Sequence, residues 1–249
     1  MSLLNEHVAH YRDIFAIDGV LASPTLVFGF QDVVAHPISE TPVEHVLRAV
    51  RHRAPRLLPE RVLHTYLERR SRRHPMPADF DFPDLPSLLR ARGVDDITVL
   101  DLFDPRADLR LDMNEPVPAE LHGRFLSLID IGSVEHVFDT RTCLESCMRM
   151  VRVGGCYTIH TPVRGYFDHG LHTFAPEAIL GALTENGFRL ELVRFTTAAG
   201  RTVDSPNAGG DVALWAVARK EREMDTFRPP QQGVWADAYT SSTTIRGHG

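Results

Sequence analysis

Four histidines occupy positions where side chains from separate strands could meet. His136 follows one expected strand, His160 ends the next, and His169 and His172 lie in the loop that comes after it. Because parallel strands place their carboxyl ends at one edge of a sheet, we expect these rings to converge there. An imidazole near its ordinary pKa can take a proton from a nucleophilic oxygen or nitrogen. We therefore interpret all four as candidate catalytic residues, although a hydrogen bond to loop backbone is the simpler role for any one of them.

Acidic residues follow three successive expected strands, and a glycine follows the first strand of the chain. The acids are Asp101, Asp112 and Asp130, and the glycine is Gly29. A ligand that lies across strand ends needs hydrogen-bond acceptors, an apolar slot and close approach to the backbone, which a glycine permits. One such acid could equally cap a helix or face solvent. Three of them at successive strand ends favour a ligand site.

Two groups of metal-ligating side chains are weaker candidates. The first group is Cys143, Cys147, Cys156 and His160. Its spacing matches no closed zinc module, and free cysteines commonly behave as small core residues. The second group is His160, Asp168, His169 and His172, which fits no established pattern for a divalent ion. We therefore expect no bound metal.

Alternating strands and helices must position these residues. We expect strands at 25–34, 96–103, 109–113, 125–132 and 156–163, and helices at 3–17, 86–93, 140–151 and 175–186. Two further strands, 188–197 and 211–220, should form an antiparallel pair. This order predicts an α/β fold with a mostly parallel sheet, a C-terminal antiparallel strand and helices on both faces.

The same pattern divides the chain into three parts. Residues 1–22 should form an N-terminal helix or cap, and residues 23–220 should form the main domain. Between 41 and 92 the residues are charged and helix-forming, with apolar stripes at helical spacing, which predicts a helical insertion after the first strand. Residues 221–249 read as a polar tail with little folding signal.

From Asp96 to Phe195 the sequence resembles the Rossmann-like (class I) S-adenosylmethionine-dependent methyltransferases, in particular their small-molecule group. FLSLIDIGSVEHVFD is similar to the fourth strand and loop of that family, and MRMVRVGGCYTIHTP to the next helix, turn and strand. HTFAPEAILGALTENGFRLELVRF is similar to the helix and hairpin that follow. The resemblance implies a Rossmann-like sheet with S-adenosylmethionine as the cofactor.

The resemblance also implies which residues bind that cofactor. Asp101, with Leu102 beside it, holds the place of the acid that accepts hydrogen bonds from the ribose hydroxyls. Asp112 and Met113 hold the place that contacts adenine, and Asp130, Ile131 and Gly132 lie where the methionine portion would sit. The glycine-rich first motif of the family is reduced here to Gly29, Phe30 and Gln31, of which Gln31 could bind the amino-acid end of the cofactor.

Composition narrows the class of protein. The 249 residues are 43% hydrophobic, enough for one sizeable α/β core. A formal net charge of −6 argues against a surface that binds nucleic-acid phosphates. The sequence has no apolar run of the roughly 20 residues that a membrane helix needs and only three cysteines. We expect a cytoplasmic protein without membrane or nucleic-acid partners, with a homodimer as the default assembly.

Three functions fit these observations. The first is methyl transfer to an oxygen or nitrogen of a small metabolite, such as a sugar, a nucleoside or a natural-product intermediate. The second keeps the fold but uses the histidines for another reaction, such as elimination or cyclisation, and predicts turnover without a methyl donor. The third is a non-catalytic partner protein with a vestigial site. The altered first motif keeps the second and third readings open.

Overall fold

The computed structural model describes residues 3–34, 50, 62, 75–167, 169–207 and 209–231. The two helices expected between residues 41 and 73 fall almost wholly outside the described residues, as does Asp168. Within the described ranges, no helix combines the length and the apolar character that crossing a bilayer needs.

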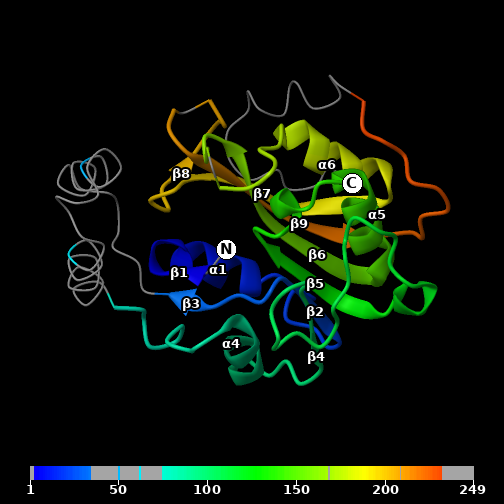
Figure 1. Cartoon of the computed structure of the whole chain (residues 1–249), viewed down its shortest axis with the longest axis horizontal. Coiled ribbons are helices and arrows are strands. Elements are labelled where there is room, and N and C mark those ends of the chain that lie inside the picture. Colours follow the sequence, from blue (N-terminus) through cyan, green and yellow to red (C-terminus); the bar gives the residue numbers. More distant parts are fainter. Residues whose placement is uncertain are drawn as a thin grey trace.

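A seven-stranded sheet forms the centre of the molecule, with the order β4-β2-β5-β6-β9-β7-β8 (Figure 1). Its parallel strands β2 (Thr25–Phe28), β4 (Ile97–Leu100), β5 (Phe125–Ile131) and β6 (Val151–Arg164) lie next to one another. Strand β9 (Val212–Lys220) lies antiparallel between β6 and β7 (Phe188–Thr197), and the short β8 (Thr202–Val203) closes the edge. The predicted parallel sheet and antiparallel pair are both confirmed.

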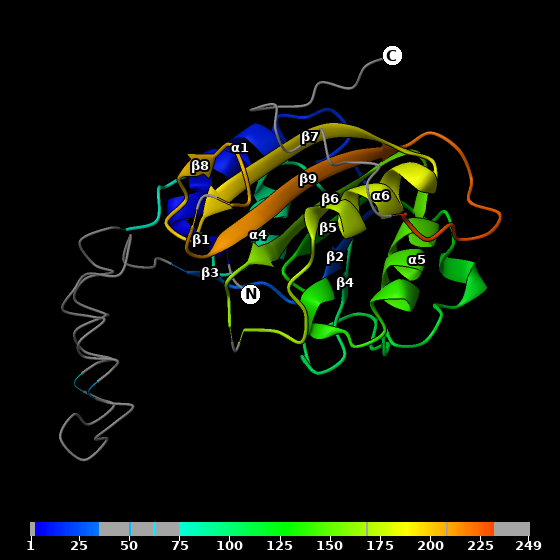
Figure 2. The same ribbon diagram turned by 90° about the horizontal axis from the view of Figure 1, so that it is seen from above.

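The sheet is buried on both faces, which explains the continuous apolar runs in its strands. All four residues of β2 are buried. Helices α5 (Thr140–Met150) and α6 (Pro176–Glu185) cover one face, and α1 (Val8–Phe15) and α4 (Leu85–Ala91) cover the other (Figure 2). Asp84 and Asp139 cap the N-termini of α4 and α5 by accepting hydrogen bonds from Ser87 N and Thr142 N.

The N-terminal segment differs from the expected helix over residues 3–17. Leu3 and Leu4 form the short strand β1 (Leu3–Leu4), which pairs in parallel with β3 (Val33–Val34). A 3-10 turn, η1 (Asn5–His7), follows, and α1 begins only at Val8. Leu3 is buried in this short strand, as it would be in a helix, so its apolar character alone does not distinguish the two.

The prediction of a strand at 109–113 is wrong. Leu109 makes a single bridge to Leu100, and the described chain then turns at Asp112. The connection from Asp101 to Leu109 is too short for a helix that would carry the chain across the sheet, so a compact turn containing Pro105 takes its place. Two other 3-10 turns, η2 (Ala119–Leu121) and η3 (Val134–His136), flank β5.

Strand β2 is the point where the strand order reverses. It pairs with β4, the next strand of this sheet along the chain, on one side and with β5 on the other, so the chain crosses from one side of β2 to the other between β4 and β5. A crevice forms at such a point because no connection covers it.

Candidate functional site

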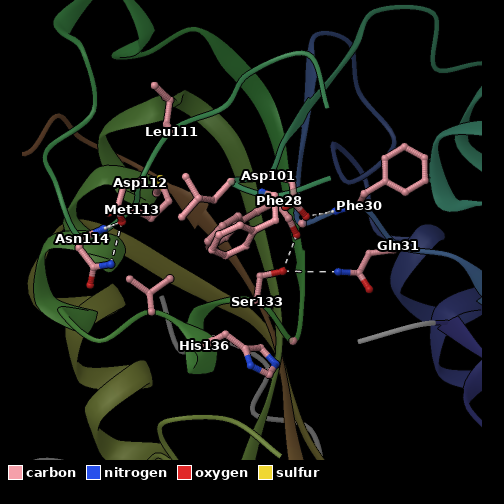
Figure 3. A pocket seen from close by; sticks show the side chains of 15 residues that line it. Phe28, Phe30, Gln31, Asp101, Leu111, Asp112, Met113, Asn114, Ser133 and His136 are labelled. Atoms are coloured by element: carbon pink, nitrogen blue, oxygen red, sulfur yellow. Dashed lines mark hydrogen bonds between the residues drawn. The ribbon is translucent and has the colours of Figure 1, made fainter. Parts of the chain in front are cut away.

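A cavity of about 240 Å³ lies at this crevice, among the loops that follow β2, β4 and β5 (Figure 3). Its volume is slightly below the range of about 300–1,000 Å³ that is typical of small-molecule sites. The loops bring together residues far apart in sequence: Phe28, Gly29, Phe30, Gln31, Asp101, Leu102, Phe103, Leu111, Asp112, Met113, Asn114, Gly132, Ser133, His136 and Val137. Most of the residues that the sequence assigns to cofactor binding are in this set.

Gly29 shapes the turn at the end of β2. Its φ of +78° lies in the left-handed region, and its N–H donates to Leu100 O at 2.7 Å. A Cβ at this position would collide with Ser133 Oγ, which is itself held by donating to Phe28 O at 2.7 Å. The backbone here therefore requires glycine and stays accessible from the cavity.

Asp101 follows β4 and fixes the neighbouring loops. One carboxylate oxygen accepts from Phe30 N at 2.9 Å, and the other accepts from Phe103 N and Asp104 N at 2.8 and 3.0 Å. Partial burial alone raises the pKa of this carboxyl, but the three backbone donors together bring it below its ordinary value. Asp101 is thus an ionised acceptor on the cavity wall.

Asp112 and Met113 form the opposite part of the wall. Asp112 Oδ1 accepts from the backbone N–H and the side-chain amide of Asn114, at 2.9 and 2.7 Å. These hydrogen bonds lower the pKa of Asp112. Met113 is buried beside it. An ionised acceptor thus lies next to an apolar surface, an arrangement suited to a heteroaromatic ring with an exocyclic donor.

Phe30 and Gln31 line another part of the same cavity. In Figure 3 both lie on the other side of Asp101 and Ser133 from Asp112. The Phe30 ring packs under the guanidinium of Arg106, 3.6 Å from the ring centroid. Gln31 is buried, and its Nε2 lies 3.4 Å from Ser133 Oγ, while its Oε1 has no hydrogen-bond partner within the described chain. That oxygen is an acceptor without a partner, buried in the wall of the cavity.

Asp130 and Ile131 do not line the cavity, although the sequence groups them with Gly132, which does. Asp130 lies inside β5 and is fully buried, where its carboxyl accepts from Ser133 N at 2.8 Å and from the Tyr157 hydroxyl at 3.3 Å. Burial, with the charge of Glu135 adding to it, raises the pKa of Asp130 to about 8. Its visible role is to hold the turn that carries Ser133.

The four candidate histidines separate into different environments. His136 lines the cavity, and its ring centroid lies 5.2 Å from that of His169, next to the buried Glu135. His172 lies in the same loop as His169, with Nε2 3.1 Å from Phe138 O. His160 is buried and stacks on Trp215 at 3.7 Å, and neither of its ring nitrogens has a hydrogen-bond partner among the described residues. The expected convergence is therefore limited to His136 and His169.

Glu135 is the site residue that sequence reasoning missed. It directly precedes His136, but nothing local indicates that a loop more than 30 residues later covers it. The cysteines are also separated, because Cys143 and Cys147 belong to the core beneath α5 and Cys156 to the core on the other face of the sheet. The four-ligand group of cysteines and His160, the weaker interpretation of the sequence, is therefore not assembled.

Comparison with family models and with curated protein sequences gives no match. Among solved structures, similarity extends to the 1,6-didemethyltoxoflavin-N1-methyltransferase of Burkholderia thailandensis, with 13% identity, 86% of this chain and 85% of that chain covered, and a TM-score of 0.40. A candidate methyltransferase of Bacillus halodurans shares 14% identity over 53% of this chain and 84% of that chain, with a TM-score of 0.39. A 16S rRNA (adenine(1408)-N(1))-methyltransferase of Catenulisporales acidiphilia shares 14% identity over 86% and 92%, with a TM-score of 0.35.

The assignment of the fold is based on the topology of the sheet. The parallel strands β4, β2, β5 and β6 are followed by the antiparallel β9, which is inserted between β6 and β7. This inserted strand distinguishes methyltransferases from nicotinamide-binding Rossmann domains. The chain therefore has the fold of the Rossmann-like (class I) methyltransferases.

Proposed function

We propose that this protein is an S-adenosylmethionine-dependent methyltransferase whose cofactor lies in the cavity at the ends of β2, β4 and β5. The observation that carries the proposal is the pair of ionised acceptors, Asp101 and Asp112, which line one cavity with the Gly29 turn at the strand-order reversal. When bound, this cofactor supplies a methyl group on a sulfonium that is already activated as a leaving group.

The residues present fit the three parts of the cofactor. Backbone donors occupy three of the roughly four lone-pair sites of Asp101, which leaves one that can accept from a ribose hydroxyl. Asp112 can accept from the adenine amino group while Met113 packs against the ring. The unpartnered Oε1 of Gln31 can accept from the ammonium group of the methionine portion. Gly29 lets the cofactor approach the backbone between them.

The acceptor that we propose is a small molecule methylated at oxygen or nitrogen. The net charge of −6 supports a small metabolite over a polyanion such as RNA. In the transfer, the acceptor atom forms a bond to the methyl carbon, the carbon–sulfur bond breaks with its electron pair on sulfur, and the acceptor proton leaves to a nearby base or to solvent. His136 lines the cavity and the ring centroid of His169 lies 5.2 Å from that of His136, so both are proposed to lie near the acceptor.

Replacing Asp101 by asparagine should weaken cofactor binding. The amide has no negative charge and fewer lone pairs for the ribose hydroxyls, and a hydrogen bond to a charged group contributes about 1.5–3 kcal/mol. We expect the dissociation constant for S-adenosylhomocysteine, measured by calorimetry, to rise by about 10- to 100-fold.

The exposed Asp204→Asn is a matched control and should bind as the wild type does. Because Asp101 also holds the loops after β2 and β4, thermal unfolding of Asp101→Asn must accompany the titration. Absence of any binding to the wild type at millimolar ligand would overturn the proposed function.

A further inference from the structure

We propose that Glu135, His136 and His169 bind a divalent first-row transition-metal ion beside the cofactor cavity. Each side chain offers one ligand atom, and these atoms all lie within 4.8 Å of one another. His169 Nε2 is 3.7 Å from Glu135 Oε1. Two imidazoles and one carboxylate form a donor set that suits ions such as Zn²⁺, Co²⁺ or Fe²⁺ better than Mg²⁺ or Ca²⁺, which favour oxygen ligands.

A buried carboxylate oxygen points to the ion independently of this geometry. Glu135 has no exposed surface, and its Oε2 accepts from Thr161 Oγ1 at 3.1 Å. Its Oε1 is buried without a hydrogen-bond partner within the described chain, and so is His169 Nε2. Apart from their mutual contact at 3.7 Å, these two buried atoms have no polar partner among the described residues, which is costly unless something binds them. Thr161 meanwhile fixes the carboxylate, as partners behind metal ligands commonly do.

The loop that carries His169 is fastened over Glu135. Leu171 N and His172 N both donate to Glu135 O, at 2.9 and 3.1 Å. A Cβ on Gly170 would lie 3.0 Å from Glu135 Cγ and from its carbonyl oxygen, which is tighter than an ordinary contact, so glycine favours this close approach. The loop is therefore held where His169 faces the carboxylate.

Binding requires a small closure of the three side chains. Ligand atoms at about 2.0–2.2 Å from a metal lie roughly 3 Å apart, so separations of up to 4.8 Å must shorten. Glu135 is fixed, but the His136 side chain is exposed and can rotate toward it. Three protein ligands leave coordination positions open, and His136 lies on the cavity wall.

The open positions suggest what the ion does, a step that rests on the proposed function. A hydroxyl oxygen of the acceptor could occupy one of them, next to the methyl donor. Coordination to a divalent ion favours the deprotonated form of a bound hydroxyl. The acceptor class would then be a hydroxylated small molecule, methylated at oxygen.

Metal binding can be tested with Co²⁺ as the probe, after treatment of the full chain with a chelator. We expect one Co²⁺ per chain, visible as a d–d absorption band that Zn²⁺ abolishes by competition. His169→Ala and Glu135→Gln should each weaken Co²⁺ binding by more than about tenfold. His122→Ala removes an exposed histidine elsewhere and should change nothing.

Because Glu135→Gln alters a buried residue and could unfold the chain, the partly exposed His169→Ala decides the result. No Co²⁺ binding by the wild type, or equal binding by His169→Ala, would overturn the metal site. Calorimetry with S-adenosylhomocysteine on the metal-free protein separates the two proposals. If the protein binds Co²⁺ but not S-adenosylhomocysteine, the metal site stands and the methyltransferase assignment is contradicted. If it binds S-adenosylhomocysteine but not Co²⁺, only the metal site is contradicted.

Discussion

Replacing Gly29 by alanine is expected to weaken cofactor binding severely while the chain remains folded. A non-glycine residue at φ +78° costs about 1–2 kcal/mol, and the added Cβ would also displace Ser133 Oγ from its bond to Phe28 O. Both changes move the turn that lines the cavity. We expect the dissociation constant for S-adenosylhomocysteine to rise by about 100-fold, equivalent to about 2.8 kcal/mol.

Gly93→Ala is the matched control for this experiment. Gly93 has a φ of +87°, but a Cβ there meets no atom within 4 Å, so its replacement adds backbone strain without a collision. It follows α4, away from the lining of the cavity. Calorimetry and thermal unfolding of both variants distinguish strain from steric blockage. If Gly29→Ala bound the nucleoside as tightly as Gly93→Ala, the cofactor would have to lie elsewhere.

The sequence located this cavity because its walls follow short apolar strands. Gly29 and Asp101 stand directly after β2 and β4, so their positions depend on local patterns, whereas Asp112 lies at a turn and not in the strand expected there. Asp130 was placed less well because β5 continues to Ile131. In a strand, a shift of one residue turns a side chain to the opposite face, and apolar patterns do not fix a strand end to that accuracy.

The histidines show the limit of local reasoning more clearly. His160 lies within β6, which continues to Arg164, and it stands opposite Trp215 on β9, so its surroundings are set by the register of two strands far apart in sequence. Glu135 and His169 meet because backbone hydrogen bonds from Leu171 and His172 fasten a distant loop. Neither the contact of His160 with Trp215 nor that of Glu135 with His169 can be predicted from residue spacing in the sequence.

His160→Phe is expected to make the protein more resistant to acid. Burial lowers the pKa of His160 well below its ordinary value, and the nearby His7 and His10 lower it further. Burial likewise lowers the pKa of His7, whose ring lies 5.4 Å from that of His160, to about 4. The unfolded chain therefore takes up a proton near pH 6.5 that folded His160 excludes, so stability is present above that pH and is lost as the pH falls.

The variant removes this linkage and keeps an aromatic ring against Trp215. Relative to the wild type, its free energy of unfolding should increase by about 1.4 kcal/mol for each pH unit below roughly 6.5, or about 2 kcal/mol at pH 5. Urea unfolding of both proteins between pH 8 and pH 5 measures the difference in their free energies of unfolding. Asp130 makes the opposite contribution, because its raised pKa favours the folded state as the pH falls, but this contribution is the same in both proteins and cancels.

A larger ring can lower stability at every pH by overpacking, so the decisive quantity is how the difference between the two proteins changes with pH. Parallel curves for the two proteins would mean that His160 accepts a proton in the folded state, as a catalytic base in contact with solvent would.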